Sequence, residues 1–353
     1  MSPSPAAPSP AQSPAPREVR AEQELSLEEI RAQLAAPARD PLLARLGIRE
    51  QDAADLVPVI EAALADEEIL AEVARIANQL GAAAGLDVPA LDLAARKDEL
   101  DALGARLAPG EGLIPILAFL VSTGTVRRWH AARGLTTEQS WLVLADLGQQ
   151  MRVHRAGTGR LGLHQLNWVT MNWAGRLVQL GRLQFDLHRA RTATLDGAGR
   201  DEEASAVPPQ EEPRERWVIG THIPATGPLD PAAVGASFAE ATAYFTAHYP
   251  DLAEGREPGD PAFGHEFTCW SWLISEEFAE ITGPGSNLAR FAARWEVLKE
   301  IPDDGDSALF FCFGLRPPQD LRALPRRTRL ERGVADRLAD GRGWTSGLGR
   351  IIR

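Results

Sequence analysis

Three side chains in the C-terminal half of the chain carry groups that can move a proton or attack a carbon atom, namely His222, Glu266 and Cys269. An imidazole or a carboxylate acts as a general base when it lies within hydrogen-bonding distance of the proton that it removes. Of the two, Glu266 is the preferred base if its carboxylate is buried. The alternative for both residues is an ordinary polar group that satisfies hydrogen bonds at the edge of a strand.

Cys269 can act as a nucleophile only if a nearby base or cation lowers the pKa of its thiol. The sequence places no such partner beside it, so a small buried residue on an alternating strand is the simpler interpretation. Cys269 and Cys312 lie far apart and show no C-x-x-C spacing, which argues against a disulfide scaffold and a zinc module. The histidines lack ligand spacing, and we expect no metal site and a reducing, cytoplasmic location.

Four further polar residues could hold a ligand near these groups: Arg182, Gln184, Ser271 and Asn287. Arg182 and Gln184 alternate along one predicted strand, so a guanidinium and an amide could donate from the same face to a phosphate or a carbonyl oxygen. Ser271 and Asn287 could add donors to the same cleft. The alternatives are a solvated sheet face for the first pair, and a strand hydroxyl and a helix cap for the second.

The charge balance excludes one large class of partners. Asp and Glu number 49 against 37 Lys and Arg, which gives a net charge of -12, so we expect no nucleic-acid binding. The longest strongly apolar run, residues 113–121, is far shorter than the roughly 18 residues of a membrane span. The start of the chain lacks a basic region followed by an apolar core, and we therefore expect neither membrane insertion nor export.

The 353 residues are enough for two domains, and the first part of the chain reads as helical. Residues 1–25 form a Pro/Ser/Ala-rich tail that we expect to be disordered, with a polyproline II ligand as the alternative. Residues 26–135 form the predicted helical N-terminal domain, because Ser26 and Glu29 have capping-box spacing and apolar residues repeat at helical spacing in 66–81. Asp40-Pro41 predicts another helix start.

Residues 136–353 form the predicted second domain, in which strands alternate with helices. In residues 182–188, Leu183, Phe185 and Leu187 share one face, while Arg182, Gln184, Asp186 and His188 share the other. The other predicted strands are residues 217–223, 267–273, a hairpin of 296–301 with 307–314, and a final edge strand at 348–352. This pattern predicts a mixed α/β, or α+β, fold.

Helices and one loop complete this second domain. Asp230-Pro231 begins a helix that carries both tyrosines, Tyr244 and Tyr249, whose place beside Phe245 favours packing over a role as proton donors. Another helix is predicted at 330–341. Residues 192–216 contain Gly, Pro and clustered acids, and we expect a flexible acidic surface loop there.

Three ordered blocks carry a family resemblance: LGRLQFDLH at 180–188, THIPATGPLDPAAVGASFAEATAYF at 221–245 and FTCWSWLISEEFAEITGPGSNLARF at 267–291. Together they resemble the bacterial GNAT-like acyltransferases, which join an N-acyltransferase N-terminal helical domain to a GNAT-like C-terminal domain. The resemblance covers residues 26–315. It implies a mixed β-sheet flanked by helices, an acyl-coenzyme A co-substrate, and an amine-bearing small molecule or protein as acceptor.

The sequence departs from this family at one block. The usual Cys-His-Ser-Trp-Leu-Leu appears as residues 269–274 with Trp270 where His is expected, so a base role for that His does not carry over. The glycine-containing turn that would bind a pyrophosphate also lacks a strong match. Gly157 and Gly159 have only the glycine spacing, and they follow a predicted helix where a strand should precede, so a glycine-rich helix stop is the simpler interpretation.

These departures leave more than one function open. The first is transfer of an acyl group from acyl-coenzyme A to an amine. The alternative is a non-catalytic ligand-binding or scaffold protein that keeps the fold, because fold alone does not establish activity. A thiol enzyme that depends on Cys269 ranks third.

Overall fold

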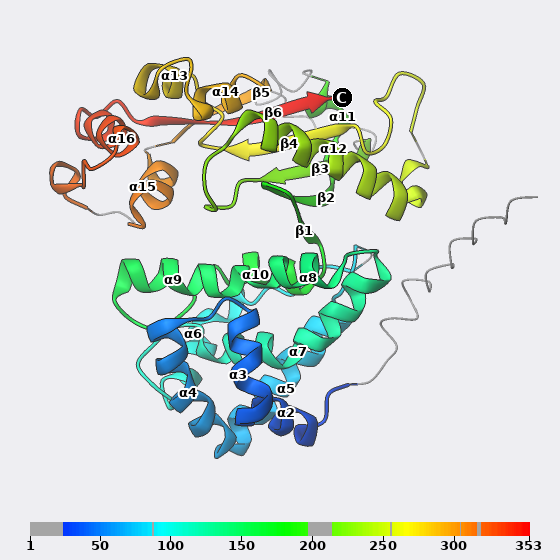
Figure 1. The fold of residues 1–353 in the computed structure, drawn as a ribbon, viewed down its shortest axis with the longest axis vertical. Helices are drawn as coiled ribbons and strands as arrows, with labels where there is room; N and C mark the ends of the chain where they lie inside the picture. Colours follow the sequence, from blue (N-terminus) through cyan, green and yellow to red (C-terminus); the bar gives the residue numbers. More distant parts are fainter. Residues whose placement is uncertain (1–23, 87, 197–213, 255, 304, 316–318) are drawn as a thin grey trace, which may run out of the picture. The chain divides into compact units, whose positions relative to one another are not determined.

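The computed structural model describes residues 24–353 except 87, 197–213, 255, 304 and 316–318. The chain divides into two compact units, one made of residues up to 147 together with 165–175, and the other of residues 148–164 and 176–353. Figure 1 labels their elements. Nearly all of the predicted tail and most of the predicted acidic loop lie outside the described residues.

The first unit is helical, as predicted. Its helices are α2 (Leu27–Leu34), α3 (Ala36–Arg45), α4 (Glu50–Leu64), α5 (Glu67–Ala82), η1 (Ala94–Arg96), α6 (Lys97–Gly104), α7 (Leu113–Ala132), α8 (Thr137–Leu144) and α10 (Leu166–Trp173). The helix α9 (Asp146–Thr158) begins in this unit and continues into the second. The helical part thus runs beyond residue 135, because α8 and α10 both pack against α7. No helix in the described part of the chain is long and apolar enough to cross a membrane.

Side-chain caps fix where these helices begin. Ser26 and Glu29 form the predicted capping box at the start of α2, and Asp66 accepts hydrogen bonds from the first turn of α5. The helix start predicted at Asp40-Pro41 is wrong. α3 begins at Ala36, where another proline occupies the first turn, and Pro41 lies inside the helix.

The described strands form a six-stranded mixed sheet in the second unit, in the order β1-β2-β3-β4-β6-β5. The strands are β1 (Leu177–Leu180), β2 (Leu183–Arg191), β3 (Glu215–His222), β4 (Glu266–Ser271), β5 (Glu296–Asp303) and β6 (Trp344–Ile352). β3 and β4 run parallel, whereas the other neighbouring strands run antiparallel. The predicted mixed sheet with helices is therefore confirmed.

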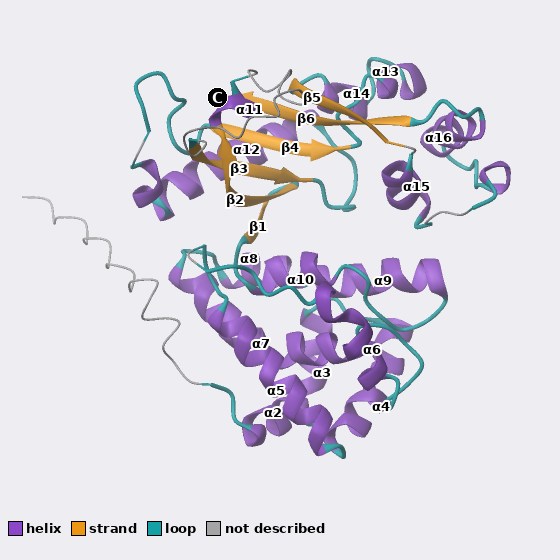
Figure 2. Ribbon diagram, turned by 180° about the vertical axis from the view of Figure 1, so that it is seen from behind, coloured by secondary structure: helices purple, strands orange, loops and turns teal. Residues whose placement is uncertain are grey.

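One face of this sheet is apolar and covered by the long helix α12 (Pro231–His248). Phe185 of β2 and Phe267 of β4 both pack edge-on against Phe238 of α12, with ring centroids 5.9 Å and 4.9 Å away. The helix lies in front of the sheet in Figure 1 and behind it in Figure 2. Because side chains alternate along a strand, the polar residues of β2 point to the opposite face.

The remaining helices of this unit are α11 (Thr192–Leu195), η4 (Pro250–Ala253), α13 (Glu277–Thr282), α14 (Asn287–Ala292), α15 (Asp306–Phe313), η5 (Leu321–Ala323) and α16 (Arg329–Ala339). The predicted hairpin is wrong, since 307–313 belongs to α15 and β5 pairs with β6 instead. Gly305 and Gly314 flank α15 with φ angles of 91° and 71°, conformations that suit glycine and begin and end a helix here. β6 lies between β4 and β5, so it is not the edge strand that the sequence predicted.

Candidate active site

A carboxylate shared by two histidines occupies the polar face of the sheet. Asp186 of β2 accepts a hydrogen bond from His222 of β3, with 2.8 Å between Oδ1 and Nε2. Its second oxygen, Oδ2, lies 3.3 Å from Nδ1 of His188, which is also on β2. The register explains the contact, because Gln184 pairs with His222 and Asp186 pairs with Gly220. Residues 36 positions apart therefore meet on one face.

Glycine at position 220 makes room for this cluster. A Cβ atom built on Gly220 would lie 1.9 Å from Oδ1 of Asp186 and 2.9 Å from Cε1 of His188. Such distances are far below van der Waals contact. Any other residue at this position would displace the carboxylate from the histidines.

Asp186 is buried, yet its environment favours the ionised form. Burial alone would raise the pKa of Asp186, but the hydrogen bonds with His188 and His222 outweigh it and hold the pKa well below its usual range. The carboxylate can only accept hydrogen bonds, so Nε2 of His222 carries the hydrogen and Nδ1 keeps the lone pair of the neutral ring. This arrangement suits His222 to act as a general base.

The cluster lies where the parallel strands stop pairing. β3 and β4 pair only at Ile219 with Phe267 and at Gly220 with Thr268, although β3 continues to His222 and β4 to Ser271. Strand edges that do not pair with each other leave backbone groups for an extended ligand to bond, as in peptide addition to a sheet edge. The candidate site is therefore the C-terminal ends of β3 and β4.

Trp270 stands at this end of β4. Trp270 lies two residues after Thr268 on the same strand, so both side chains belong to the polar face, and Trp270 is 57% exposed. The sequence analysis identified Trp270 as the replacement for a family histidine. The imidazole of His222 ends the neighbouring strand, β3.

Glu266, the preferred base in the sequence analysis, lies at the other end of β4 and is tied to Arg216. Its two carboxylate oxygens accept from Nε and Nη2 of Arg216 at 2.8 Å and 2.7 Å. Both side chains are almost fully buried. The hydrogen bonds that Arg216 donates to Glu266 raise the pKa of Arg216 above its usual range. This bidentate pair favours the structural interpretation of Glu266.

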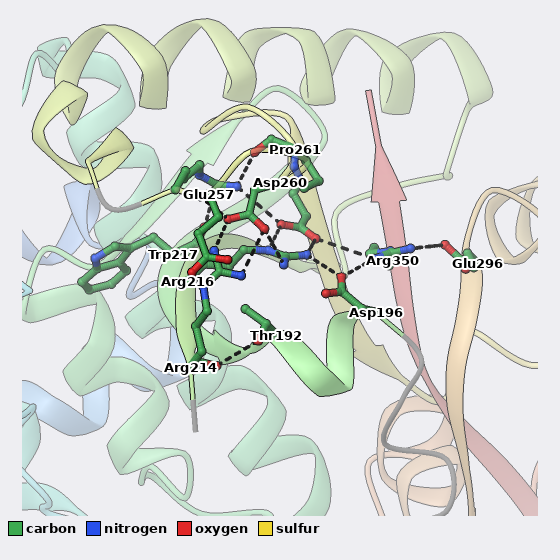
Figure 3. Close-up of polar contacts among 12 residues, drawn as sticks. Thr192, Asp196, Arg214, Arg216, Trp217, Glu257, Asp260, Pro261, Glu296 and Arg350 are labelled. Carbon is green, nitrogen blue, oxygen red and sulfur yellow. Dashed lines mark hydrogen bonds and ion pairs between the residues drawn. The ribbon is translucent and has the colours of Figure 1, made fainter. Parts of the chain in front are cut away.

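The Glu266–Arg216 pair is the centre of a larger ion-pair network, shown in Figure 3. Arg216 also contacts Asp260 at 3.1 Å and Asp196 at 3.0 Å, and Arg214 binds Asp260. Asp196 precedes residues 197–213 and Arg214 follows them. The network thus fixes both sides of that segment to the sheet.

Cys269 lies on the face opposite the histidines. It alternates with Thr268 on β4, its side chain is buried, and it is a free thiol. Burial raises the pKa of Cys269 strongly, which disfavours the thiolate. The structure therefore favours the packing interpretation of this residue.

Arg182 occupies the turn between β1 and β2, and its guanidinium is used within the protein. Nε, Nη1 and Nη2 donate to the carbonyl oxygens of Pro228, Pro224 and Gly227 at 2.9, 2.9 and 2.8 Å. These carbonyls belong to the loop between His222 and α12. Arg182 thus holds that loop in place.

The other predicted binding residues are placed as follows. Gln184 is buried and lies opposite His222 in the strand register, so the structure brings it beside the cluster. Ser271 ends β4, and its hydroxyl accepts from the backbone N–H of Leu273 at 3.0 Å. Asn287 is the first residue of α14, whose N-cap is the preceding Ser286. These contacts do not join Ser271 or Asn287 to the histidines.

The glycines considered for pyrophosphate binding end a helix. Gly157 lies in the last turn of α9 and Gly159 follows it with a φ angle of 71°. The first described strand, β1, begins only at Leu177. The placement favours the helix-stop interpretation.

The alternating sequence placed Asp186 and His188 on the polar face of their strand, but nothing in it marked them as site residues. Their alternation with the apolar Phe185 and Leu187 indicated that they lie on the polar face of the strand. The partner across the sheet, His222, depends on a register that the sequence alone does not specify.

Two family models match the chain. The N-acyltransferase N-terminal domain matches residues 38–175, and the GNAT-like C-terminal domain matches residues 177–351. No curated protein matches.

Solved structures of acyltransferases are similar over nearly the whole chain. An acyltransferase in complex with decanoyl-CoA and teicoplanin is 26% identical with a TM-score of 0.69, covering 96% of this chain and 99% of the other. An acyltransferase in complex with decanoyl-CoA is 25% identical with a TM-score of 0.68, covering 93% and 99%. Both domain matches and these likenesses agree in order and extent, and the chain belongs to the GNAT-like acyltransferases that carry an N-acyltransferase N-terminal domain.

Proposed function

We propose that this protein transfers an acyl group from an acyl-coenzyme A to an amine, with His222 as the general base. The observation that carries this proposal is the hydrogen bond of 2.8 Å between Asp186 and His222 at the end of β3. Membership of the acyltransferase family and the acyl-CoA complexes of similar structures support the donor. The free thiols of Cys269 and Cys312 fit the reducing cytoplasm as its location.

The chemistry follows from the tautomer of His222. The amine nitrogen attacks the thioester carbonyl carbon, a C–N bond forms, and the C–S bond breaks with release of the coenzyme A thiolate. Nδ1 of His222 takes the proton that the amine must lose. The Asp186 carboxylate stabilises the imidazolium that results, as an acidic partner does for a catalytic histidine.

The similar structures narrow the substrates to test first. They hold decanoyl-CoA, octanoyl-CoA and teicoplanin, so we take a medium-chain acyl-CoA as the donor and a teicoplanin-like small molecule as the amine acceptor. Trp270, exposed beside the strand ends, offers an apolar surface to either substrate.

The decisive experiment follows release of free coenzyme A from decanoyl-CoA in the presence and absence of teicoplanin, with mass spectrometry of the product. We expect amine-dependent release by the wild type. His222→Gln should lower kcat by about 10²- to 10⁴-fold, the usual contribution of a general base. His265→Gln is the matched control, because His265 contacts the carbonyl oxygen of Arg353 and takes no part in the Asp186 cluster.

Other outcomes would select the alternatives. Saturable binding of decanoyl-CoA without transfer to any amine would identify a binding or scaffold protein, the reading that Trp270 first suggested. A loss of transfer in Cys269→Ser would instead favour the thiol enzyme. We expect that variant to retain its turnover, because Cys269 is buried on the opposite face.

A further inference from the structure

We propose that His188 is a second proton-transfer residue, which protonates the departing coenzyme A thiolate through the hydroxyl of Thr268. The inference rests on the proposed function and deepens it. It assigns a role to a histidine that neither the base chemistry nor the fold requires. Its basis is the position of His188 between Asp186 and Thr268.

The contacts of His188 form a short chain toward the strand ends. Nδ1 lies 3.3 Å from Oδ2 of Asp186, and Nε2 lies 3.3 Å from Oγ1 of Thr268. The His188 side chain is 41% exposed, whereas Thr268 is buried. A proton can therefore enter from solvent at His188 and reach an enclosed hydroxyl.

Thr268 stands at the point where the two parallel strands part. It forms the last pair of β4 with β3, opposite Gly220. A thioester that binds between the unpaired ends of these strands places its sulfur near this hydroxyl. Thr268 can donate its proton to the sulfur and accept one from Nε2 of His188 in the same step, since a hydroxyl is both donor and acceptor.

One carboxylate shared by two imidazoles keeps the charge of the site constant. Asp186 is ionised and can balance one imidazolium, whereas two imidazoliums around it would repel each other. In this relay His188 is the proton donor and His222 is the proton acceptor. As His222 takes the proton of the amine, His188 gives its own to the thiolate, and Asp186 again faces a single imidazolium.

The reaction balances without a further reagent. The amine loses one proton to His222, the acyl carbon exchanges sulfur for nitrogen, and the thiolate gains one proton that came from His188. The products are the amide and free coenzyme A. Transfer of a proton from His222 to His188 through solvent restores the starting state.

The tyrosines of this chain do not serve as the acid. Tyr244 and Tyr249 are its only two, and both are buried on or beside the end of α12. They pack against Phe245 at ring distances of 5.2 Å and 5.8 Å. Helix α12 covers the face opposite the Asp186 cluster, so the phenols lie on the wrong side of the sheet.

The test compares two leaving groups. A thiol of low pKa leaves without protonation, whereas an alkyl thiol such as coenzyme A departs more slowly as its thiolate. We would measure single-turnover transfer from decanoyl-CoA and from a decanoyl thiophenyl ester to the same amine, with wild type, His188→Asn and His222→Gln. Asparagine keeps a donor near Asp186, and circular dichroism verifies the fold.

We expect His188→Asn to lower transfer from decanoyl-CoA by about 10²-fold and transfer from the thiophenyl ester by less than about threefold. His222→Gln should slow transfer from both donors. Equal losses for both donors in His188→Asn would overturn the proposal and leave His188 as a residue that only positions Asp186. A wild type that transfers from neither donor would instead reject the proposed function.

Thr268 provides a second measurement that needs only the natural donor. Thr268→Val removes the hydroxyl at nearly constant volume, and Thr268→Ser keeps it. We expect the valine variant to lose kcat with decanoyl-CoA to a similar extent as His188→Asn, with KM little changed, and the serine variant to recover most of it. Full activity in Thr268→Val would contradict the relay.

Discussion

Asp186 and Gly220 face each other across β2 and β3, and the carboxylate of the first occupies the space that a side chain on the second would fill. Gly220 is therefore part of the site, because it has no side chain to displace the carboxylate. It sets the distance from Asp186 to His222 without any contact between Gly220 and a substrate.

The first prediction tests this relationship. Gly220→Ala should displace Asp186, because the added Cβ would lie 1.9 Å from its oxygen. We expect kcat to fall by about 10²-fold or more, as for loss of the base, with a stability cost of roughly 1–3 kcal/mol from overpacking. Steady-state kinetics and thermal unfolding measure the two effects. Gly235→Ala, which has open space around its Cβ and lies within helix α12, should leave kcat unchanged and should not lower stability.

A second prediction concerns Arg182. Arg182→Ala should release the loop that carries Pro224, Gly227 and Pro228, since three hydrogen bonds to carbonyls are lost. We expect about 2 kcal/mol of lost stability and a higher KM for acyl-CoA. Arg182→Lys should recover only part, because an ammonium cannot reproduce the planar fork. An unchanged KM in Arg182→Ala would show that the loop takes no part in donor binding.

The third prediction separates stability from catalysis at Glu266. Glu266→Gln leaves Arg216 without its bidentate partner, and breaking a buried pair costs about 3–5 kcal/mol. Denaturant unfolding should show this loss. At a temperature where the variant is folded, kcat should stay within about threefold of the wild type. A loss of about 10²-fold or more in folded protein would restore Glu266 as a base.

The fourth prediction concerns acid stability of the helical unit. Burial, and then the charge of Arg127, lower the pKa of His130 to about 4, while the unfolded value is near 6.5. Between these values the unfolded chain binds the proton that the folded one does not, so stability falls as pH drops from about 6.5 to about 4. We expect the loss from this residue to approach roughly 3 kcal/mol at pH 4.

Chemical unfolding at pH 7 and pH 4.5 measures this effect. His130→Gln, which keeps a polar group near Ser140 but cannot titrate, should lose less stability than the wild type over the same interval. An equal loss in both proteins would assign the acid sensitivity to other groups.

The sequence predicted much of the fold because its local signals agree with the structure. The capping box at Ser26, the helix within residues 66–81 and the helix after Asp230 all lie where expected. It failed for residues 307–314, where an apolar run has no periodicity that separates a strand from a helix. It also failed for β6, whose partners β4 and β5 are chosen by long-range pairing.

The site was harder to predict than the fold. Alternation placed Asp186 and His188 on one face, but the meeting with His222 depends on strand register. Glu266 was a candidate base because it lies beside a predicted strand, and it was preferred over His222 only if its carboxylate is buried. Its partner Arg216 lies 50 positions away in the sequence. No local sequence pattern indicates that two residues so far apart form an ion pair.

The ion pairs beside residues 197–213 have a consequence for chain entropy. The backbone N–H of Thr192 donates to the carbonyl oxygen of Arg214 at 3.0 Å, and Asp196 is held by Arg216. The described residues on the two sides of this segment, Asp196 and Arg214, therefore lie at adjacent points of the fold. Closing a loop between fixed neighbours costs only about 0.6 kcal/mol for each doubling of its length, so this place in the chain can lengthen, shorten or accept an inserted domain while the sheet that holds Asp186 and His222 stays as it is.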